Sequence, residues 1–459
     1  MSATQPTSSS PAPAQAFGDM FDCVIVGGGL AGGLIALALN RAHPEKRIAL
    51  VEAGRNLGGN HRWSWFDSDL SAQGRALLSS FEQTGWDDGY DVRFPKYQRK
   101  LNTSYRSMAS SDFHDGLVRA LPQNSLFLGR KARAIDAAGI DLAPANTNAG
   151  DNGAGDAEIG DNAGAALRLN ARTVIDCRSF KPSAHLKGGW QVFLGRHIRL
   201  PGPHGVERPM IMDAAVDQLA PYGNGAAYRF VYVLPLGERD VFIEDTYYAD
   251  DPDLDRAALA GRIDHYATEH GWDDNAIIGH EAGSLPVLTG GDFGAYQDEV
   301  RIPGVTLAGA RGGFTHPLTS YTMCVAVENA LAIAQDADLQ GERLAAKFEA
   351  RARRHWRKTG YYRLLARFLF FAARPEKRVN VFQRFYALRE GLIERFYAAR
   401  SNPMDKIRVL WGEPPVPIPS AIAAMFRSGA PLKTGEAIAR SPGKADISQR
   451  PRTPTETEA

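Results

Sequence analysis

Three glycines and one glutamate near the start of the chain have the spacing of a dinucleotide-binding turn. Gly27, Gly29 and Gly32 follow an apolar run of strand length and open an Ala- and Leu-rich pattern that is typical of a helix. The first glycine permits the tight bend, the second lets backbone amides approach a pyrophosphate, and the third lets the helix pack on the strand. Glu52 ends the next apolar strand, 20 residues after Gly32, where its carboxylate can bind a ribose hydroxyl. The pattern predicts a bound dinucleotide, against the alternative of a glycine-rich turn between core elements.

The residues after Glu52 favour FAD over NAD. A glycine pair at 58–59 is followed by His61 and then by an aromatic run at 63–65. A large flavin dinucleotide needs the chain to pass close to it before polar and aromatic side chains are delivered beside the isoalloxazine. The alternative is a surface loop with an aromatic anchor.

A second strand, glycine-rich turn and helix follows at 305–334. The turn contains Gly309, Arg311, His316 and Pro317. The positive N-terminal end of its helix suits the electron-rich N1/O2 edge of a flavin, above all a reduced, anionic one. We therefore expect these four residues to border the cofactor, although a single histidine such as His316 is more often structural than catalytic.

Asp176 ends an apolar strand, Thr173–Cys177, that resumes the first domain. In flavoproteins of this architecture an acid in such a place lies near the adenine half of the cofactor. It could equally cap a turn.

The bulk composition excludes several classes of protein. A formal net charge of +1 over 459 residues gives no overall attraction to nucleic acid. The three cysteines are far apart in apolar contexts, and neither CxxC nor HExxH occurs, so we expect neither disulfides nor a metal. The N-terminus lacks the basic start and apolar core of a signal peptide, and no apolar run reaches about 18 residues. The sequence predicts a cytoplasmic protein, or one held on a membrane surface without crossing it.

Changes of pattern along the chain predict an α/β protein with two discontinuous domains and a helical C-terminal region. The first is a Rossmann-like, FAD-binding domain of the hydroxylase or reductase type, and the second carries a mixed substrate-binding sheet with a hairpin at 228–247. The boundaries are 21–75, 105–185 and 303–340 for the FAD domain (with a mobile insertion at about 144–165), 76–104 and 186–302 for the substrate domain, 341–436 for the helical region, and 1–20 and 437–459 for disordered tails.

The stretch 351–400 combines basic and aromatic residues in an unusual density. It holds 14 Lys and Arg against 3 Asp and Glu, interleaved with aromatic residues at helical spacing. Aromatic side chains with long basic neighbours suit helices lying in a lipid interface. The alternative is a set of ordinary amphipathic helices, packed on the core with a solvated basic face. A nucleic-acid site is a further possibility, but no known motif accompanies it.

Taken together, these motifs resemble the bacterial lycopene cyclases, the lycopene β-cyclase family of carotenoid biosynthesis. The resemblance extends from Asp22 to about Met425, and its most specific parts are Ile-Glu-Asp-Thr at 243–246 and Gly-Phe-Thr-His-Pro at 313–317. Its other parts lie at 27–33, 58–64, 209–218, 230–236, 308–312 and 412–417. Arg62 and Ala215 depart from the Thr that is more usual in the family, and the insertion at 146–165 is private to this chain.

The resemblance implies a non-redox isomerase that turns the linear ends of lycopene into β-rings, by way of γ-carotene to β-carotene. It further implies that FAD must be reduced, with NAD(P)H as the electron donor. The expected partners are lycopene and other linear carotenes, the inner membrane surface, and other carotenoid biosynthesis enzymes. The expected location is cytoplasmic and peripheral on that membrane.

Glu244 and Asp245 are the candidate catalytic residues. Cyclisation needs a strong acid in a dry place, because a proton must reach C2 of the terminal double bond. In a strand, Phe242, Glu244 and Thr246 share one face while Asp245 lies on the other. We therefore expect Glu244 to carry the proton, since desolvation favours its neutral form, and Asp245 to be a structural acceptor. A register slip of one residue exchanges the two roles, and a pair of solvated hairpin acids is the alternative.

Three questions stay open at this point. The proton donor could be Glu244 or the reduced flavin itself, and Trp63, Trp65 and Phe314 could stabilise a cation with their π faces. The rival functions are an FAD-dependent monooxygenase or reductase of an isoprenoid lipid, and a non-catalytic carotenoid carrier. The number of ends cyclised, the range of carotenes, the oligomeric state and the electron donor are not determined by these patterns.

Overall fold

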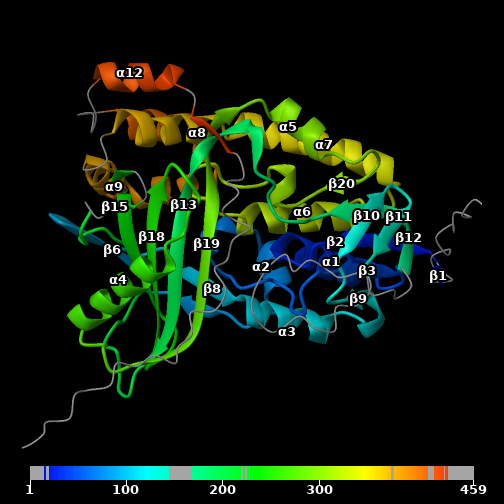
Figure 1. Cartoon of the computed structure of the whole chain (residues 1–459), viewed down its shortest axis with the longest axis horizontal. Coiled ribbons are helices and arrows are strands. Elements are labelled where there is room, and N and C mark those ends of the chain that lie inside the picture. The colour runs from blue at the N-terminus through cyan, green and yellow to red at the C-terminus, as the bar shows by residue number, and fades with distance from the viewer. Residues whose placement is uncertain are drawn as a thin grey trace, which may run out of the picture.

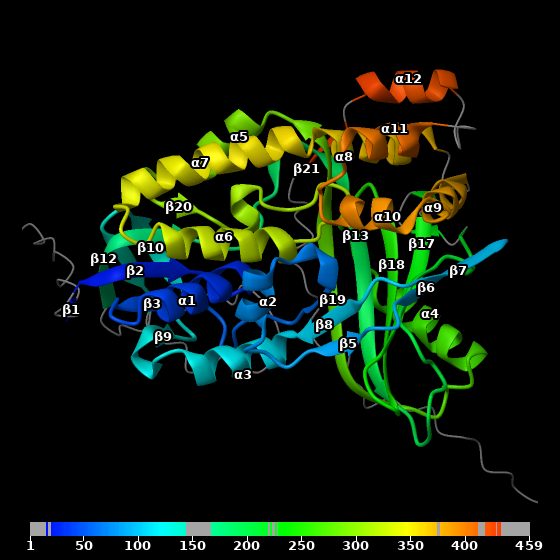
Figure 2. The same cartoon turned by 180° about the vertical axis from the view of Figure 1, so that it is seen from behind.

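Two large β-sheets, two small ones and the helices packed on them form the part of the chain that the structure describes (Figures 1 and 2). The structure is a computed structural model that describes residues 15–16, 20–143, 167–218, 221–222, 225–226, 228–373, 377–411, 418–427 and 429–432. The insertion predicted at about 144–165, the motif at 412–417 and the tail predicted at 437–459 lie outside these residues. Gln15–Ala16, within the predicted N-terminal tail, forms a short strand, β1, that pairs with β12 (Leu167–Asp176).

The first sheet has a core of parallel strands. β2 (Phe21–Val26) lies between β12 and β3 (Ile48–Val51), and β9 (Leu126–Phe127) and β20 (Thr306–Leu307) extend the parallel part. β2 and β3 are almost entirely buried because helices and strands cover both faces, as their continuous apolar runs predict. An antiparallel edge, β10 (Ala132–Asp136) and β11 (Gly139–Leu142), completes the sheet.

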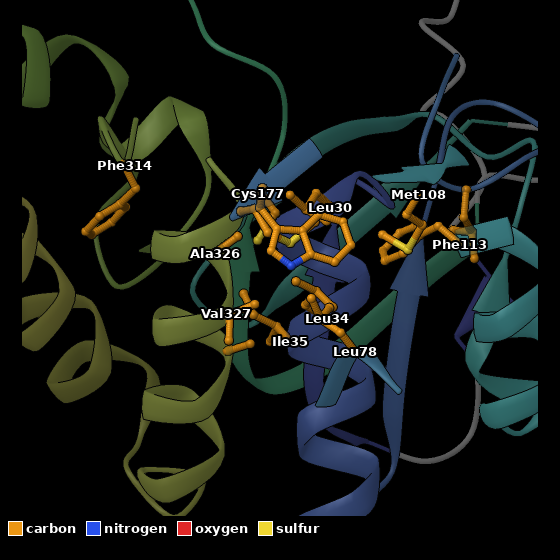
Figure 3. Close-up of a cluster of buried hydrophobic side chains, with 14 of the residues drawn as sticks. Leu30, Leu34, Ile35, Leu78, Met108, Phe113, Cys177, Phe314, Ala326 and Val327 are labelled. Carbon is orange, nitrogen blue, oxygen red and sulfur yellow. The ribbon is translucent and has the colours of Figure 1, made fainter. Parts of the chain in front are cut away.

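The helix α1 (Leu30–Ala42) connects β2 to β3 and packs against α6 (Met323–Gln335). Figure 3 shows Ile35 of α1 beside Val327 of α6 in one buried hydrophobic cluster. The helices α2 (Ala72–Leu78) and α3 (Ser110–Ala120) cover other sides of α1. This arrangement brings two helices that are far apart in the sequence to one side of the sheet.

The second sheet is mostly antiparallel and contains the longest strands. Its order is β19-β13-β18-β17-β14-β6-β7, with β21 paired to β13. The bounds are β6 (Tyr90–Phe94), β7 (Tyr97–Leu101), β13 (Ser183–Arg199), β14 (Met210–Asp213), β17 (Tyr228–Pro235), β18 (Asp240–Ala249), β19 (Ala276–Gly291) and β21 (Ala430–Leu432). The hairpin predicted at 228–247 is confirmed, because β17 and β18 pair antiparallel throughout. Two smaller sheets are β4 (Arg62–Phe66), β8 (Tyr105–Ala109) and β5 (Thr84–Trp86), and the pair β15 (Pro221–Tyr222) and β16 (Gly225–Ala226).

Helices cover the two faces of the second sheet differently. α4 (Arg256–Glu269) packs on one face, against β13 and β18. The C-terminal helices α8 (Gly360–Arg367) with the π-helical turn η4 (Phe368–Ala372), α9 (Arg378–Tyr386) and α10 (Glu390–Tyr397) pack on the other face, and α11 (Pro403–Leu410) and α12 (Ile418–Phe426) follow them. The helix α7 (Gly341–Lys358) packs instead against β20 and β12 of the first sheet. A short helix, α5 (Phe293–Val300), follows β19. Short 3-10 turns are η1 (Asp67–Asp69), η2 (Gln123–Ser125) and η3 (Ala310–Gly312).

The aromatic residues of 351–400 belong to the protein core. Tyr362, Tyr386 and Phe396 are buried in a cluster that includes the side chains of the second sheet. The Phe382 ring stacks on Tyr228 of β17 with 4.3 Å between ring centroids. For the buried side chains of this set the prediction of a lipid interface is wrong. The alternative, amphipathic helices packed on the core, describes them.

The exposed apolar side chains lie further along, on α11 and α12. They are Met404, Ile407, Leu410, Trp411, Ile422, Met425 and Phe426. Figure 2 shows α12 at the outer edge of the molecule, beyond α8 and α11. Among the described residues, no helix combines the length and apolar character that crossing a bilayer requires.

We expect Phe396→Ala to lower the free energy of unfolding by about 3 kcal/mol, because it removes a buried ring that packs on His316, Tyr362 and Phe385. The matched control is Phe426→Ala, whose ring is 83% exposed and whose loss should change stability by less than about 0.5 kcal/mol. Guanidinium denaturation without detergent measures both. Equal effects of the two substitutions would contradict the assignment of the 351–400 aromatics to the core.

Candidate active site

The glycine turn between β2 and α1 has the geometry that the sequence predicts. Gly27 has a φ of +100°, and a Cβ there would lie 2.9 Å from the backbone of Cys177 and Arg178. A Cβ on Gly32 would lie 1.9 Å from the Gly27 carbonyl oxygen, so the helix packs on the turn only without a side chain. A Cβ on Gly29 would meet no atom within 4 Å. Gly29 therefore leaves open space at the N-terminus of α1, where the first-turn amides have no partner within the helix.

Glu52 lies directly beside this turn. Its Oε2 accepts a hydrogen bond from the Gly28 amide at 2.7 Å, and its Oε1 accepts one from the Gly54 amide at 2.8 Å. A carboxylate oxygen has a second acceptor site, so both oxygens can still bind ribose hydroxyls. A Cβ on Gly28 would lie 2.4 Å from Leu57, so Gly28 is a third crowded position beside Gly27 and Gly32, and the sequence reasoning missed it.

The second glycine turn lies against the first. A Cβ on Gly309 would be 3.3 Å from the Ala31 side chain of α1. Asn329 of α6 donates a hydrogen bond to the Ala308 carbonyl at 3.0 Å, which holds the turn to its own helix. Two turns from distant parts of the chain thus meet at one edge of the first sheet, as expected for a dinucleotide held between them.

Asp176 and Arg311 form part of the support for these turns. The buried Asp176 carboxylate accepts hydrogen bonds from the backbone amide and the guanidinium of Arg178, at 2.7–3.0 Å. Arg311 donates to the Ser179 carbonyl at 3.1 Å and lies 3.9 Å from Asp176. Burial lowers the pKa of Arg311, and the Asp176 carboxylate opposes that effect. The alternative of a turn-capping Asp176 describes this arrangement, and its contact with adenine stays a prediction.

His316 is a structural residue in this conformation. Its Nδ1 accepts hydrogen bonds from the amides of Leu318 and Thr319, and its Nε2 donates to the Phe396 carbonyl at 3.1 Å. Burial lowers the pKa of His316 to about 3, so the ring is neutral. Because backbone groups occupy both nitrogens, the ring anchors α10 to the turn. The Pro317 carbonyl accepts a hydrogen bond from Leu288 of β19 at 2.8 Å, which ties the same turn to the second sheet.

The loop that follows Glu52 joins the two sheets. Gly58 and Gly59 both have positive φ, at +83° and +69°, and the Gly58 amide donates to the Gly28 carbonyl at 2.9 Å. Asn60 donates to the His280 carbonyl of β19 at 2.8 Å. His61 is exposed beside Asn60, and its carbonyl accepts a hydrogen bond from the first residue of α3. The loop predicted to border the isoalloxazine thus contacts the substrate domain directly.

Glu244 is on the face of β18 that the period-2 pattern predicts. Phe242, Glu244 and Tyr248 point to the same side, and Phe242 and Tyr248 belong to the aromatic cluster beneath the C-terminal helices. Thr246 donates a hydrogen bond to Glu244 Oε1 at 2.7 Å. Burial raises the pKa of Glu244, which favours the protonated form.

Asp245 points to the other side of β18 and is fully buried there. Its carboxylate accepts hydrogen bonds from the Arg229 guanidinium, with the shortest N–O distance at 2.6 Å. The predicted register is confirmed, and the slip by one residue does not occur. Asp245 is a partner of Arg229, as expected of a structural acceptor, and a catalytic role for it stays a prediction.

Glu281 on β19 is the carboxyl that sequence reasoning missed. Glu244 and Glu281 lie directly opposite Gly195, one on each side of β13, and their side chains are hydrogen-bonded to each other. Burial and the neighbouring Glu244 raise the pKa of Glu281 well above its usual value. The only sequence signal was an acid within the apolar run before Leu285, and its partner becomes visible only when the strand register is known.

Tyrosines, not the predicted tryptophans, surround Glu244. Tyr232 of β17 is its direct neighbour on the side away from Gly195. The Tyr105 hydroxyl lies 3.3 Å from that of Tyr321, and repulsion by the Glu244 charge adds to the burial that raises the pKa of Tyr105. Trp65 and Phe314, expected beside a cation, are instead buried in the hydrophobic cluster around α1 and α6.

The model of the family described as lycopene cyclase protein matches residues 22–423. The chain belongs to the lycopene cyclase family. It is 39% identical over 402 residues to the lycopene beta-cyclase of Pseudescherichia vulneris, covering 88% of this chain and 96% of that protein. It is 35% identical over 406 residues to the lycopene beta-cyclase of Pantoea ananas, covering 88% and 98%.

Solved structures with a similar fold include a flavin-dependent halogenase from Xanthomonas campestris, with a TM-score of 0.51 at 12% identity over 89% of this chain and 94% of that one. A geranylgeranyl bacteriochlorophyll reductase-like protein from Thermoplasma acidophilum has a TM-score of 0.54 at 12% identity, over 88% of this chain and 98% of that one. The p-nitrophenol 4-monooxygenase of Pseudomonas putida DLL-E4 has a TM-score of 0.54 at 13% identity, over 83% and 99%. This cyclase-family chain therefore has the mixed α/β fold of FAD-dependent oxygenases and reductases, as predicted. Among its described residues no cluster of three or more His, Cys, Asp or Glu is arranged to hold a metal ion.

A substitution at Gly29 tests where the dinucleotide binds, because the space beside this residue is open. We expect Gly29→Ala to leave the unfolding transition of the apoprotein unchanged, because the new methyl group contacts no protein atom within 4 Å. The same methyl group would occupy the position expected for the pyrophosphate, so the Kd for FAD should rise at least tenfold, about 1.4 kcal/mol. Quenching of flavin fluorescence measures the Kd. The control is Gly261→Ala on α4, where a Cβ also meets nothing; equal Kd values for both variants would place the cofactor elsewhere.

Proposed function

We propose that this chain is a lycopene β-cyclase that closes the linear ends of lycopene into β-rings without net oxidation or reduction. Membership of the lycopene cyclase family and the names of its relatives support this function. The observation that carries the proposal on this chain's own residues is Glu244, an acid held on an apolar, aromatic face where burial favours its protonated form.

The reaction matches what such a site can do. A proton moves from the Glu244 carboxyl to C2 of the terminal double bond, and the 5,6 double bond attacks to close the ring. This leaves a tertiary cation at C5, which loses the proton on C6 to give the β-ring. One proton enters and one leaves, so the product has the mass of the substrate. Water would capture the cation, and the buried aromatic face around Glu244 excludes it.

The glycine turn and its neighbours fit FAD. The open space beside Gly29 suits the pyrophosphate, Glu52 is oriented for the ribose, and the loop at 58–61 spans from that turn to β19. When bound in its reduced form, FAD supplies negative charge that stabilises a nearby cation. NAD(P)H is the proposed reductant. The role of this chain's residues is to hold the group, exclude water and present Glu244.

Glu244→Gln should lower the rate of β-ring formation by at least a hundredfold, since amide replacement removes the transferable proton and general acid catalysis supplies about 10² to 10⁴. The assay is anaerobic incubation with lycopene in liposomes, FAD and excess NADPH, with products identified by chromatography and mass. Glu238→Gln, exposed on the turn between β17 and β18, is the control and should keep full activity. A product gaining oxygen or hydrogens would indicate a monooxygenase or reductase, and retained activity in Glu244→Gln would assign the acid to another group.

We propose that the exposed apolar residues of α11 and α12 bind the membrane surface. We define the α11–α12 patch as Met404, Ile407, Leu410, Trp411, Ile422, Met425 and Phe426. Met404, Ile407 and Trp411 repeat at helical spacing, and Trp411 is 68% exposed. Seven exposed large apolar side chains within two consecutive helices are unusual on a soluble protein.

Basic residues border the α11–α12 patch. Arg408 and Arg427 are exposed beside it, and Lys406 lies over the Tyr361 ring at 5.6 Å. Aromatic and aliphatic side chains next to basic ones suit the headgroup boundary of an anionic bilayer, which is also where a carotene is dissolved. We therefore assign a peripheral location on the inner membrane surface, where other carotenoid enzymes could supply the substrate.

The double variant Trp411→Ser with Phe426→Ser should weaken binding to vesicles of phosphatidylglycerol and phosphatidylethanolamine at least tenfold. Each lost aromatic group removes about 1.5–3 kcal/mol of apolar burial when fully inserted. Co-sedimentation with the vesicles measures the partition. The matched control is Ile277→Ser with Ile278→Ser, two exposed apolar residues at the start of β19. Unchanged binding of the first variant, or equal loss in both, would remove the α11–α12 patch as the docking surface.

A further inference from the structure

We propose that Glu281 is a positioning residue for cyclisation, which shares one proton with Glu244 across Gly195 and thereby keeps the acid loaded. This inference rests on the proposed function, because it assigns the source of the proton for that reaction. It concerns a residue on β19 that lies outside every motif singled out in the sequence.

The strand register places the two carboxyl groups in one transverse row. In order across the sheet the row is Tyr232 on β17, Glu244 on β18, Gly195 on β13 and Glu281 on β19. Residues directly opposite each other in neighbouring strands point to the same face. Since adjacent strands are about 4.8 Å apart, the two glutamate backbones are separated by roughly 10 Å. Two extended glutamate side chains can close that distance only if the residue between them on β13 has no side chain.

Gly195 supplies the gap. A Cβ at this position would lie 2.3 Å from the Phe242 ring and 3.2 Å from the Cγ atom of Glu281. The space above Gly195 is thus already filled by a phenyl ring and by the Glu281 side chain reaching across. The two carboxyl groups meet there in a hydrogen bond. A hydrogen bond between two carboxyl groups requires a proton on one of them, because two carboxylates are both acceptors only.

The surroundings favour one proton on the pair. Glu281 is 6% exposed, burial raises the pKa of both glutamates, and repulsion by the Glu244 charge raises the pKa of Glu281 further. Arg62 of β4 opposes full protonation, since its amide donates to Glu281 and its guanidinium charge lowers the pKa of Glu281. The pair with one shared proton and the Arg62 cation is therefore electrically balanced.

Other titratable groups face the pair from the elements packed around it. On the same side lie Tyr232 of β17, Tyr105 of β8 and His197 of β13, and the pKa of His197 is lowered by burial and by Arg62. The negative charge of Asp112 on α3 raises the pKa of Arg62. Both tyrosines have raised pKa values and stay neutral, so the carboxyl pair and Arg62 carry the local charge near neutral pH.

The shared proton has a direct consequence for the reaction. When the Glu244 oxygen gives its proton to C2, the pair is left with two facing carboxylates. Their repulsion makes the pair a stronger base than a single carboxylate. It regains one proton when it takes the proton from C6 of the cation, so that the proton count balances over each ring formed.

The test is the pH profile of cyclisation by the full-length holoenzyme with lycopene in liposomes, for the wild type, Glu281→Gln and Glu281→Asp. Removing the like charge and leaving Arg62 in place lowers the pKa of Glu244. The alkaline limb of kcat/KM should therefore move to lower pH by at least one unit in Glu281→Gln. Glu281→Asp keeps the charge and should keep the limb. A rate lowered by the same factor at every pH, or no change in Glu281→Gln, would overturn the proposal.

A second measurement tests the proposal even if Glu281→Gln fails to fold. Infrared spectra of the wild type and of Glu244→Gln should both titrate a carboxylic acid C=O band, at a higher pH in the wild type because the shared proton is bound more tightly there. Identical titration in both proteins would overturn the pairing. Wild-type protein that leaves lycopene unchanged would instead refute the proposed function, and the infrared result would still decide whether the two glutamates are paired.

Discussion

A carboxyl group out of water is tolerated only when it keeps its proton or finds a counter-charge, and this constraint organises the second sheet. The two adjacent acids of β18 meet it in opposite ways. Asp245 is paired with the counter-charge of Arg229 on the face covered by α4. Glu244 is placed on the aromatic face, where its neighbours are Thr246, Gly195 and the Glu281 carboxyl. One strand thus separates a structural charge from a group that holds a transferable proton.

The position of Glu244 is useful only because the cofactor domain is tied to the same sheet. Three hydrogen bonds join the domains along β19, and each comes from a loop predicted to border the flavin or from its continuation. Asn60 bonds the His280 carbonyl, the Pro317 carbonyl accepts from Leu288, and Ser320 donates to the Pro286 carbonyl. His316 holds the second loop in place because both of its ring nitrogens form hydrogen bonds with backbone groups. A neutral, buried histidine therefore contributes rigidity at a place where its motif suggests chemistry.

Patterns that act over a few residues were sufficient to predict the glycine turn and the face of Glu244. Gly27 is required by its positive φ and Gly32 by its contact with the Gly27 carbonyl, both within the turn, and the alternation along β18 needs only its own period of two. Glu281 could not be predicted in the same way, because its role depends on the register of β13 with two other strands. Phe396 was misassigned since an aromatic helix has the same pattern whether its apolar face meets a sheet or a lipid. The family resemblance indicated the reaction, but not which second carboxyl lies beside the acid.

The central claim is that a carboxyl of this chain adds a proton to C2 and that no atoms are gained overall. Cyclisation of lycopene in D₂O, with reduced FAD present and oxygen absent, tests it most directly. The account predicts β-carotene that carries up to one deuterium at C2 of each ring formed. It predicts no β-carotene from the Glu244→Gln protein. A ring product without deuterium at C2, or one containing added oxygen or a transferred hydride, would contradict it.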